Sequence, residues 1–231
     1  VDVERALWSA RVDTCLARCS EHALRGDSPE RRALWLAAAL GRSVELQVWQ
    51  RACALAHVAP DAELVEWLSA AGLVHAHLAG FSFADAELSE LLEAQASEAR
   101  ALKDVHLALA EALLECAPDA FAQHAWHLER GGAIAEAQER LYLAAIREHE
   151  RGRYELAERF LAKHRALDDE RCPPAPAQER AMFALRYAQV AVAAGLSERA
   201  MQALKQAETI MGEVDGALPS DVRAKHLFVT L

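Results

Sequence analysis

Two pairs of histidines are the residues in this sequence whose spacing best suits metal chemistry. His75 and His77 form an H-x-H in a segment of alternating apolar residues, and alternation puts both side chains on one face of a strand. His124 and His127 lie three residues apart, which puts both on one side of a helix. Paired imidazoles bind zinc, but neither pair has a third ligand in its neighbourhood. Exposed histidines for the first pair and a packed helix for the second are therefore the better interpretation.

Neither the cysteines nor any known catalytic motif indicates that this chain catalyses a reaction. Cys15 and Cys19 lie one helical turn apart and could share a metal, but nothing nearby supplies a second pair of ligands, so two buried thiols are the better interpretation. With Cys53, Cys116 and Cys172 the total is five, an odd number that favours a reducing cytosol without a disulfide framework. The chain has no Gly-Lys dipeptide, so it lacks G-x-x-x-x-G-K-[ST], and it also lacks G-x-S-x-G, H-E-x-x-H and C-x-x-C. We expect a cytoplasmic chain that is no enzyme and holds no metal or cofactor.

Composition indicates an all-α protein. Of the 231 residues, 51 are Ala and 32 are Leu, against 14 Val, 3 Ile and 3 Thr, a ratio that favours helices over strands. No run of 18 apolar residues occurs, so no membrane partner is expected. The chain begins with Val1 and its last pattern stops inside a helical segment. We therefore expect it to be part of a longer protein, truncated at its C-terminus.

The first 96 residues interrupt the helical period once. Helices are expected over 3–23, 30–40, 44–56 and 61–71, and 85–95 closes the segment. Between them, 73–77 and 81–83 alternate around Gly80 as a small β-hairpin. Helices with a hairpin over roughly 28–96 indicate a winged-helix-like unit, led by the N-terminal helix.

Charge argues against DNA as the partner of this unit. The 48 residues between Arg51 and Arg100 contain no Lys or Arg but eight acids, and the whole chain carries a formal charge of −10. A helix over 61–71 would present carboxylates to phosphates, whereas groove binding needs cations. We expect no nucleic-acid partner and a winged helix that packs on other protein.

Residues 97–231 read as helix throughout, apart from a proline-containing gap at 168–177. The expected helices are 98–116, 119–130, 134–150, 154–167, 178–194 and 198–211. A motif recurs in which Gly precedes Ala by five residues: Gly132 and Ala137, Gly152 and Ala157, Gly195 and Ala200. Ala144 and Ala207 follow seven residues later, but the middle copy has His164 there. Turn glycines and close-packing alanines are typical of stacked helix pairs, so we expect a solenoid of degenerate tetratricopeptide-like repeats.

In such stacks the first helix of each pair lines a concave face. Pairing 98–116 with 119–130, 134–150 with 154–167, and 178–194 with 198–211 predicts a partner-binding groove. Its predicted residues are Glu139, Tyr142, Ile146, Met182, Leu185 and Gln189. Tyr142 and Met182 are the types that anchor a bound segment, and the alternative is that both fill the core between helices. Gly131-Gly132 equally fits a turn inside a pair, which would change this register.

The order of these elements, with several short stretches, resembles a known family. The stretches are P-E-R-R-A-L-W-L-A-A-A-L-G-R at 29–42, E-L-V-E-W-L-S-A-A-G-L-V at 63–74, F-S-F-A-D-A-E-L at 81–88 and A-W-H-L-E-R-G-G at 125–132. Together they are similar to the region downstream of the ATPase core in STAND-class signal-transduction ATPases, which include large ATP-binding LuxR-type regulators and kinase-linked ATPases. In that family F-x-F usually precedes a basic or His-containing stretch, whereas residues 84–87 here are acidic.

The resemblance implies a regulatory region without hydrolytic residues. The winged helix would be the switch arm that packs on a nucleotide-binding core, and the repeats would be a sensor or scaffold for protein partners or adjoining domains. ATP and Mg²⁺ would bind only in an upstream domain, and the full-length protein would rearrange and oligomerise. The alternatives are a stand-alone repeat adaptor that binds a peptide and a DNA-binding regulator, which the charges disfavour. A Walker motif upstream of Val1 would separate the first two.

Overall fold

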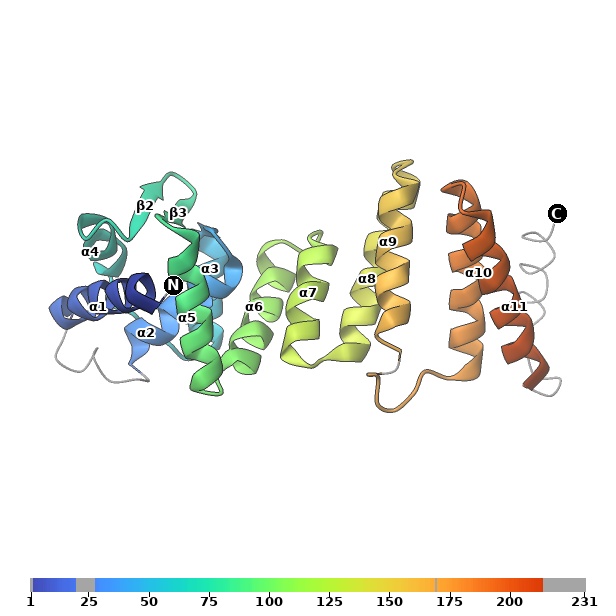
Figure 1. The fold of residues 1–231 in the computed structure, drawn as a ribbon, viewed down its shortest axis with the longest axis horizontal. Helices are drawn as coiled ribbons and strands as arrows, with labels where there is room; N and C mark the ends of the chain where they lie inside the picture. Colours follow the sequence, from blue (N-terminus) through green and yellow to red (C-terminus); the bar gives the residue numbers. More distant parts are fainter. Residues whose placement is uncertain (1, 20–27, 169, 214–231) are drawn as a thin grey trace. The chain divides into compact units, whose positions relative to one another are not determined.

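The computed structural model describes residues 2–19, 28–168 and 170–213 (Figure 1). These residues form eleven α-helices and three short β-strands, as expected for an all-α chain with a small sheet. None of the described helices is both long and apolar enough to cross a membrane. The chain divides into two compact units, Val1–Ala133 and Ile134–Leu231. The division expected at 96/97 differs from this boundary and stays a prediction.

The first unit contains seven helices and the sheet. In chain order its elements are α1 (Asp2–Cys19), α2 (Pro29–Leu40), β1 (Ser43–Glu45), α3 (Leu46–Leu55), α4 (Leu64–Ala70), β2 (Val74–His77), β3 (Gly80–Phe83), α5 (Ala86–Glu98), α6 (Leu102–Cys116) and α7 (Phe121–Gly131). Ser28 caps α2, because its hydroxyl accepts a hydrogen bond from the Arg31 amide at 3.2 Å, and Pro29 occupies the first turn. Helix α6 packs on α3 and α2, which joins the first helix pair to this unit.

The sheet has one strand more than the sequence predicted. Strand β3 lies between β1 and β2 and pairs antiparallel with both. Residues 43–45 were expected to enter a helix, but Val44 pairs with Phe81 and is buried there. Three residues are too few for alternation to be visible, so pairing with a distant strand decides their conformation. The two-stranded hairpin of the prediction is therefore part of a three-stranded sheet.

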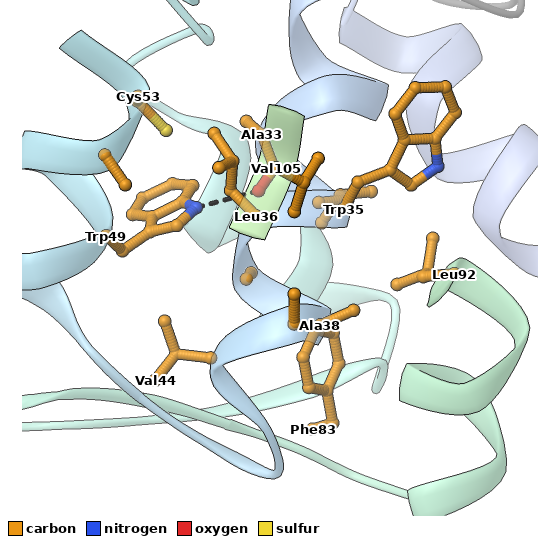
Figure 2. Close-up of a cluster of buried hydrophobic side chains, with 14 of the residues drawn as sticks. Ala33, Trp35, Leu36, Ala38, Val44, Trp49, Cys53, Phe83, Leu92 and Val105 are labelled. Carbon is orange, nitrogen blue, oxygen red and sulfur yellow. Dashed lines mark hydrogen bonds between the residues drawn. The ribbon is translucent and has the colours of Figure 1, made fainter. Parts of the chain in front are cut away.

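The core of the first unit forms around α2, α3 and the sheet (Figure 2). The Trp49 ring packs edge-on against Phe81 at 5.4 Å between centroids, and its Nε1 donates to the Ala33 carbonyl at 2.8 Å. Cys53 is buried in the same cluster, and burial raises the pKa of its thiol to about 12. This cysteine is a packed, unreactive thiol at neutral pH.

The second unit contains α8 (Ile134–Glu150), α9 (Tyr154–Ala166), α10 (Ala177–Ala193) and α11 (Ser197–Glu213). Helix α8 packs chiefly on α9, and α10 on α11, just as α6 packs on α7 in the first unit (Figure 1). The three predicted helix pairs are therefore confirmed, while the solenoid of tetratricopeptide-like repeats stays a prediction.

The repeated motif has the structural role that its spacing predicted. Gly152 and Gly195 have φ angles of 74° and 75°, in the left-handed region that favours glycine, and Gly132 has the same conformation. The alanines five residues later, Ala137, Ala157 and Ala200, are all buried. Each glycine ends one helix, and each alanine lets the next helix approach its neighbour closely.

A buried polar cluster ties α9, α10 and α11 together. The Glu158 carboxylate of α9 accepts hydrogen bonds from the Tyr187 hydroxyl at 2.7 Å and from Arg199 Nη1 at 2.6 Å. Glu158 and Tyr187 are buried, whereas Arg199 is about half exposed. Burial, and next the bond to Glu158, raise the pKa of Tyr187. The carboxylate therefore has partners from both neighbouring helices.

Candidate functional site

A cavity of about 420 Å³ opens in the second unit between α8 and α10, the first helices of two successive pairs. The end of α9 and the proline-containing connection to α10 complete its wall. Its lining residues are Ala135, Glu136, Gln138, Glu139, Tyr142, His164, Asp168, Arg171, Ala175, Glu179, Arg180, Met182 and Phe183. Concave sites of this size suit a small molecule or one or two side chains of a bound segment.

Three of the six residues predicted for the groove line this cavity: Glu139, Tyr142 and Met182. Glu139 is exposed, and Tyr142 and Met182 are half-buried, so each keeps a surface that a ligand can reach. Tyr142 also packs on the core around Ala145 and Leu161. It is therefore held in place from behind while facing the cavity.

The other three predicted residues lie elsewhere. Leu185 is buried in a cluster with Ala184 and Ala207, because its position on α10 faces α11. Ile146 and Gln189 are half-buried outside the cavity lining, and the Gln189 side chain accepts a hydrogen bond from Arg186 at 3.2 Å. The groove is thus shorter along both helices than the sequence predicted.

A hydrogen-bond network joins several residues of the cavity wall. Nε2 of the buried Gln138 donates to the His164 carbonyl at 3.0 Å and to the Asp168 carboxylate at 2.6 Å. Its Oε1 accepts from Arg171 at 3.3 Å, and Arg171 also pairs with Glu179 at 2.8 Å. The network joins α8, the end of α9, the connection and α10, so the two walls of the cavity are held at a set separation.

Aromatic stacking forms the apolar floor. The His164 ring lies parallel to Phe183, with centroids 3.9 Å apart and an interplanar angle of 11°. Burial lowers the pKa of His164 to about 4, although Asp168 acts in the opposite direction, so the ring is neutral at pH 7. The buried Nδ1 of His164 has no hydrogen-bond partner among the residues that the structure describes. A flat, uncharged surface results, continued by Tyr142 and Met182.

Charge is unevenly distributed over the lining. Four carboxylates face two guanidinium groups. Asp168 and Glu179 are engaged by Gln138 and Arg171, as described above. Glu136 and Glu139 on α8 are exposed and make no ion pair with any described residue. Arg180 on the opposite wall is exposed as well.

Sequence reasoning missed Gln138, His164, Asp168, Arg171 and Phe183 as site residues. His164 alone carried a signal, since it stands where the repeat has a buried alanine in the other two copies. The network of Gln138 depends on residues about 30 positions away, and nothing in the local sequence pattern reports such a pairing.

The two histidine pairs singled out in the sequence lie on β2 and on α7. His75 and His77 are both exposed on β2, and no group of three or more His, Cys, Asp or Glu suited to a metal occurs among the described residues. The side chains of Cys15 and Cys19 lie outside the described residues. His127 is buried and its Nδ1 lies 2.9 Å from Nδ1 of His106, a partner from α6 that the sequence did not indicate.

The buried pair of His106 on α6 and His127 on α7 is uncharged at neutral pH. Burial is the main cause that lowers the pKa of both His106 and His127, and Arg130 adds to it. The Trp126 ring stands edge-on to both, and Arg130 lies over its face at 4.9 Å. One ring must donate its Nδ1 proton and the other accept it, so the pair joins the two helices only while it shares a single proton at this contact.

Comparison with known proteins found no relative: no family model, no curated protein and no solved structure matches the chain.

Proposed function

We propose that this chain is the non-catalytic regulatory and protein-interaction region of a bacterial STAND-type signal-transduction ATPase. In this proposal the first unit contains the switch arm, and the helix pairs are a sensor or scaffold that binds a protein segment. The observation that carries the binding role is the cavity between α8 and α10, because the first helices of successive pairs form its walls.

The winged-helix assignment rests on the order of elements in the first unit. Helix α2 is followed by β1, two helices, and then β2 and β3, with β3 between the other strands. This order supports a helix–strand–helix–helix–hairpin unit of the winged type. The hairpin turn presents Leu78 fully exposed, between exposed His77 and Ala79. An apolar tip on an acidic surface suits contact with another protein domain better than contact with DNA.

Peptide binding tests the interaction role. An array of overlapping 15-residue peptides would cover the parent protein and the proteins encoded beside it. Calorimetric titration of each hit would then compare the chain with Tyr142→Ala. We expect Tyr142→Ala to weaken binding by about 1–2 kcal/mol, because the ring faces the cavity.

Tyr154→Ala is the matched control, since Tyr154 lies in the same unit, outside this cavity, and is also partly exposed. The control should leave every affinity unchanged. An array without hits, or hits that both variants weaken equally, would contradict the interaction role.

The stand-alone adaptor is separated from the ATPase region by the coding sequence upstream of Val1. A Walker motif there, with ATP turnover that changes when Leu78 of the hairpin tip is replaced by Ser, supports the switch arm. Its absence leaves the adaptor, whose peptide binding would be the same. In either case we expect no ATP turnover by this chain alone and no salt-sensitive shift of duplex DNA.

A further inference from the structure

We infer that the cavity between α8 and α10 binds an extended protein segment in which a basic side chain stands next to an apolar or aromatic one. This inference rests on the proposed function, which supplies a protein segment as the ligand, and adds the chemistry of that segment. Its basis is the combination of an apolar floor with two carboxylates on one wall that have no ion-pair partner in the described part of the chain.

The carboxylates of the α8 wall form no ion pair with any described residue. Glu136 and Glu139 stand three residues apart on α8, which places them on one side of the helix, and both line the cavity. Neither has a cation among the described residues. Asp168 accepts a hydrogen bond from the Gln138 amide and Glu179 forms an ion pair with Arg171, so both carboxylates already have partners within the protein. A cationic group of the ligand is therefore attracted to the α8 wall.

The apolar floor adjoins these carboxylates. Tyr142 follows Glu139 by three residues on α8, and the stacked rings of His164 and Phe183 line the same cavity. Because His164 is neutral, the floor does not repel a neighbouring cation and gives no anion a counter-charge. An apolar or aromatic side chain adjacent to the basic one would cover Met182 and the ring pair.

Arg180 on the α10 wall determines the orientation of this segment. It is exposed and lacks a described ion-pair partner, so it repels a basic side chain from its own wall. The cation of the ligand is thus confined to the side of Glu136 and Glu139. An acidic segment would find one free guanidinium group, against two free carboxylates that oppose it.

Three capped peptide libraries test the inference by fluorescence polarisation. Each library has a fixed tripeptide within randomised flanking residues. The first residue of the tripeptide is arginine, glutamine or glutamate, depending on the library, and the next two are leucine and phenylalanine in all three. We expect the arginine library to bind about tenfold more tightly than the glutamate library, as two partly exposed charge contacts of about 0.7 kcal/mol each would give. The difference should shrink as salt is raised.

Two double variants locate the effect. Glu136→Gln with Glu139→Gln should abolish the preference for arginine and leave binding of the glutamine library unchanged. Glu150→Gln with Glu155→Gln is the matched control, because it removes the same charge from exposed positions of the same unit outside the cavity. This control should keep the tenfold preference.

The outcomes separate this inference from the function on which it rests. Equal binding of the three libraries, weakened by Met182→Ala, would overturn the inference and keep the peptide groove. A preference for glutamate would overturn it as well, and so would arginine amide binding as tightly as the arginine library, which would indicate a small cation as the ligand. No binding of any library up to millimolar protein would instead contradict the protein-interaction role.

Discussion

Replacement of Gly80 by alanine should disrupt the sheet of the first unit. Gly80 begins β3 and pairs with Glu45 of β1 and with His77 of β2. A Cβ atom at this position would lie 2.0 Å from the Val44 carbonyl oxygen and 2.9 Å from the Leu46 amide nitrogen. Both atoms belong to the backbone, so no side-chain rotation relieves the contact. The strands must separate instead.

The magnitude follows from the distance that has to open. An ordinary carbon–oxygen contact is about 3.3 Å or longer, so β1 and β3 must move apart by more than about 1 Å. Overpacking costs about 1–3 kcal/mol, and each weakened backbone hydrogen bond adds about 1 kcal/mol. The bond from the Leu46 amide to the Ala79 carbonyl, now 2.9 Å, is one of these. We expect Gly80→Ala to reduce the free energy of unfolding by about 3 kcal/mol.

Tryptophan fluorescence isolates this effect. All five tryptophans lie in the first unit and all three tyrosines in the second: Trp8, Trp35, Trp49, Trp67 and Trp126, against Tyr142, Tyr154 and Tyr187. Urea unfolding followed by tryptophan emission therefore reports on the sheet, and Trp49 contacts Phe81 of β3 directly. Thermal unfolding should show a midpoint lower by about 10 °C.

Gly41→Ala is the control within the same unit. Gly41 has a φ of 102°, but nothing lies within 4 Å of a Cβ placed there, so its replacement costs only the conformational penalty of about 1 kcal/mol. The reasoning about backbone contact at Gly80 is refuted if Gly80→Ala lowers stability no more than Gly41→Ala does.

Three further predictions test the remaining structure. Gly152→Ala and Gly195→Ala should each destabilise the second unit by about 1 kcal/mol through φ alone, and circular dichroism should detect this while tryptophan emission does not. Acidification from pH 7 to pH 5 should destabilise the first unit by up to about 1.4 kcal/mol per pH unit for each of His106 and His127. Both histidines have lowered pKa values, so they bind fewer protons in the folded than in the unfolded protein. The stability that their neutral forms contribute is complete above pH 6.5 and is lost as the pH falls below it. His106→Phe should make the dependence of the unfolding free energy on pH shallower. Tyr187→Phe should cost about 1–2 kcal/mol in urea titrations followed by circular dichroism, because the buried Glu158 loses a donor; an unchanged midpoint would contradict the cluster.

Local sequence signals predicted the helices and their pairing, because each signal acts over a few residues. Turn glycines such as Gly152 and buried alanines such as Ala157 have roles set by backbone conformation and by contact with an adjacent helix. One boundary shows the limit of such signals. Helix α6 begins at Leu102 rather than at 98, because Arg100 has a φ of 58° and ends the preceding helix. Residue propensities do not predict a left-handed backbone conformation for an arginine, so nothing in the sequence indicated this helix end.

Long-range pairings were beyond the sequence. Val44 is a strand residue only because Phe81 lies opposite, and His106 is a buried hydrogen-bond partner only because His127 reaches it from α7. The three predicted groove residues that lie outside the cavity were also misplaced because their position depends on long-range packing. Met182 lines the cavity while also packing on the cluster of Leu185 and Ala207, whereas Leu185 is buried within that cluster, and this difference depends on packing rather than on the spacing from a turn glycine.

His164 connects the repeat with the candidate site. The other two copies of the motif have alanines at this position, and both are buried where helices approach each other closely. An imidazole is too large for such a contact, so at this point α9 presents a ring to the cavity, where it stacks on Phe183 of the next pair. The departure from the repeat therefore gives up close packing at one position and places a neutral aromatic ring in the cavity that Glu136 and Glu139 of α8 also line. A degenerate position in a repeat array is then a place to look for binding, because packing no longer explains the residue found there.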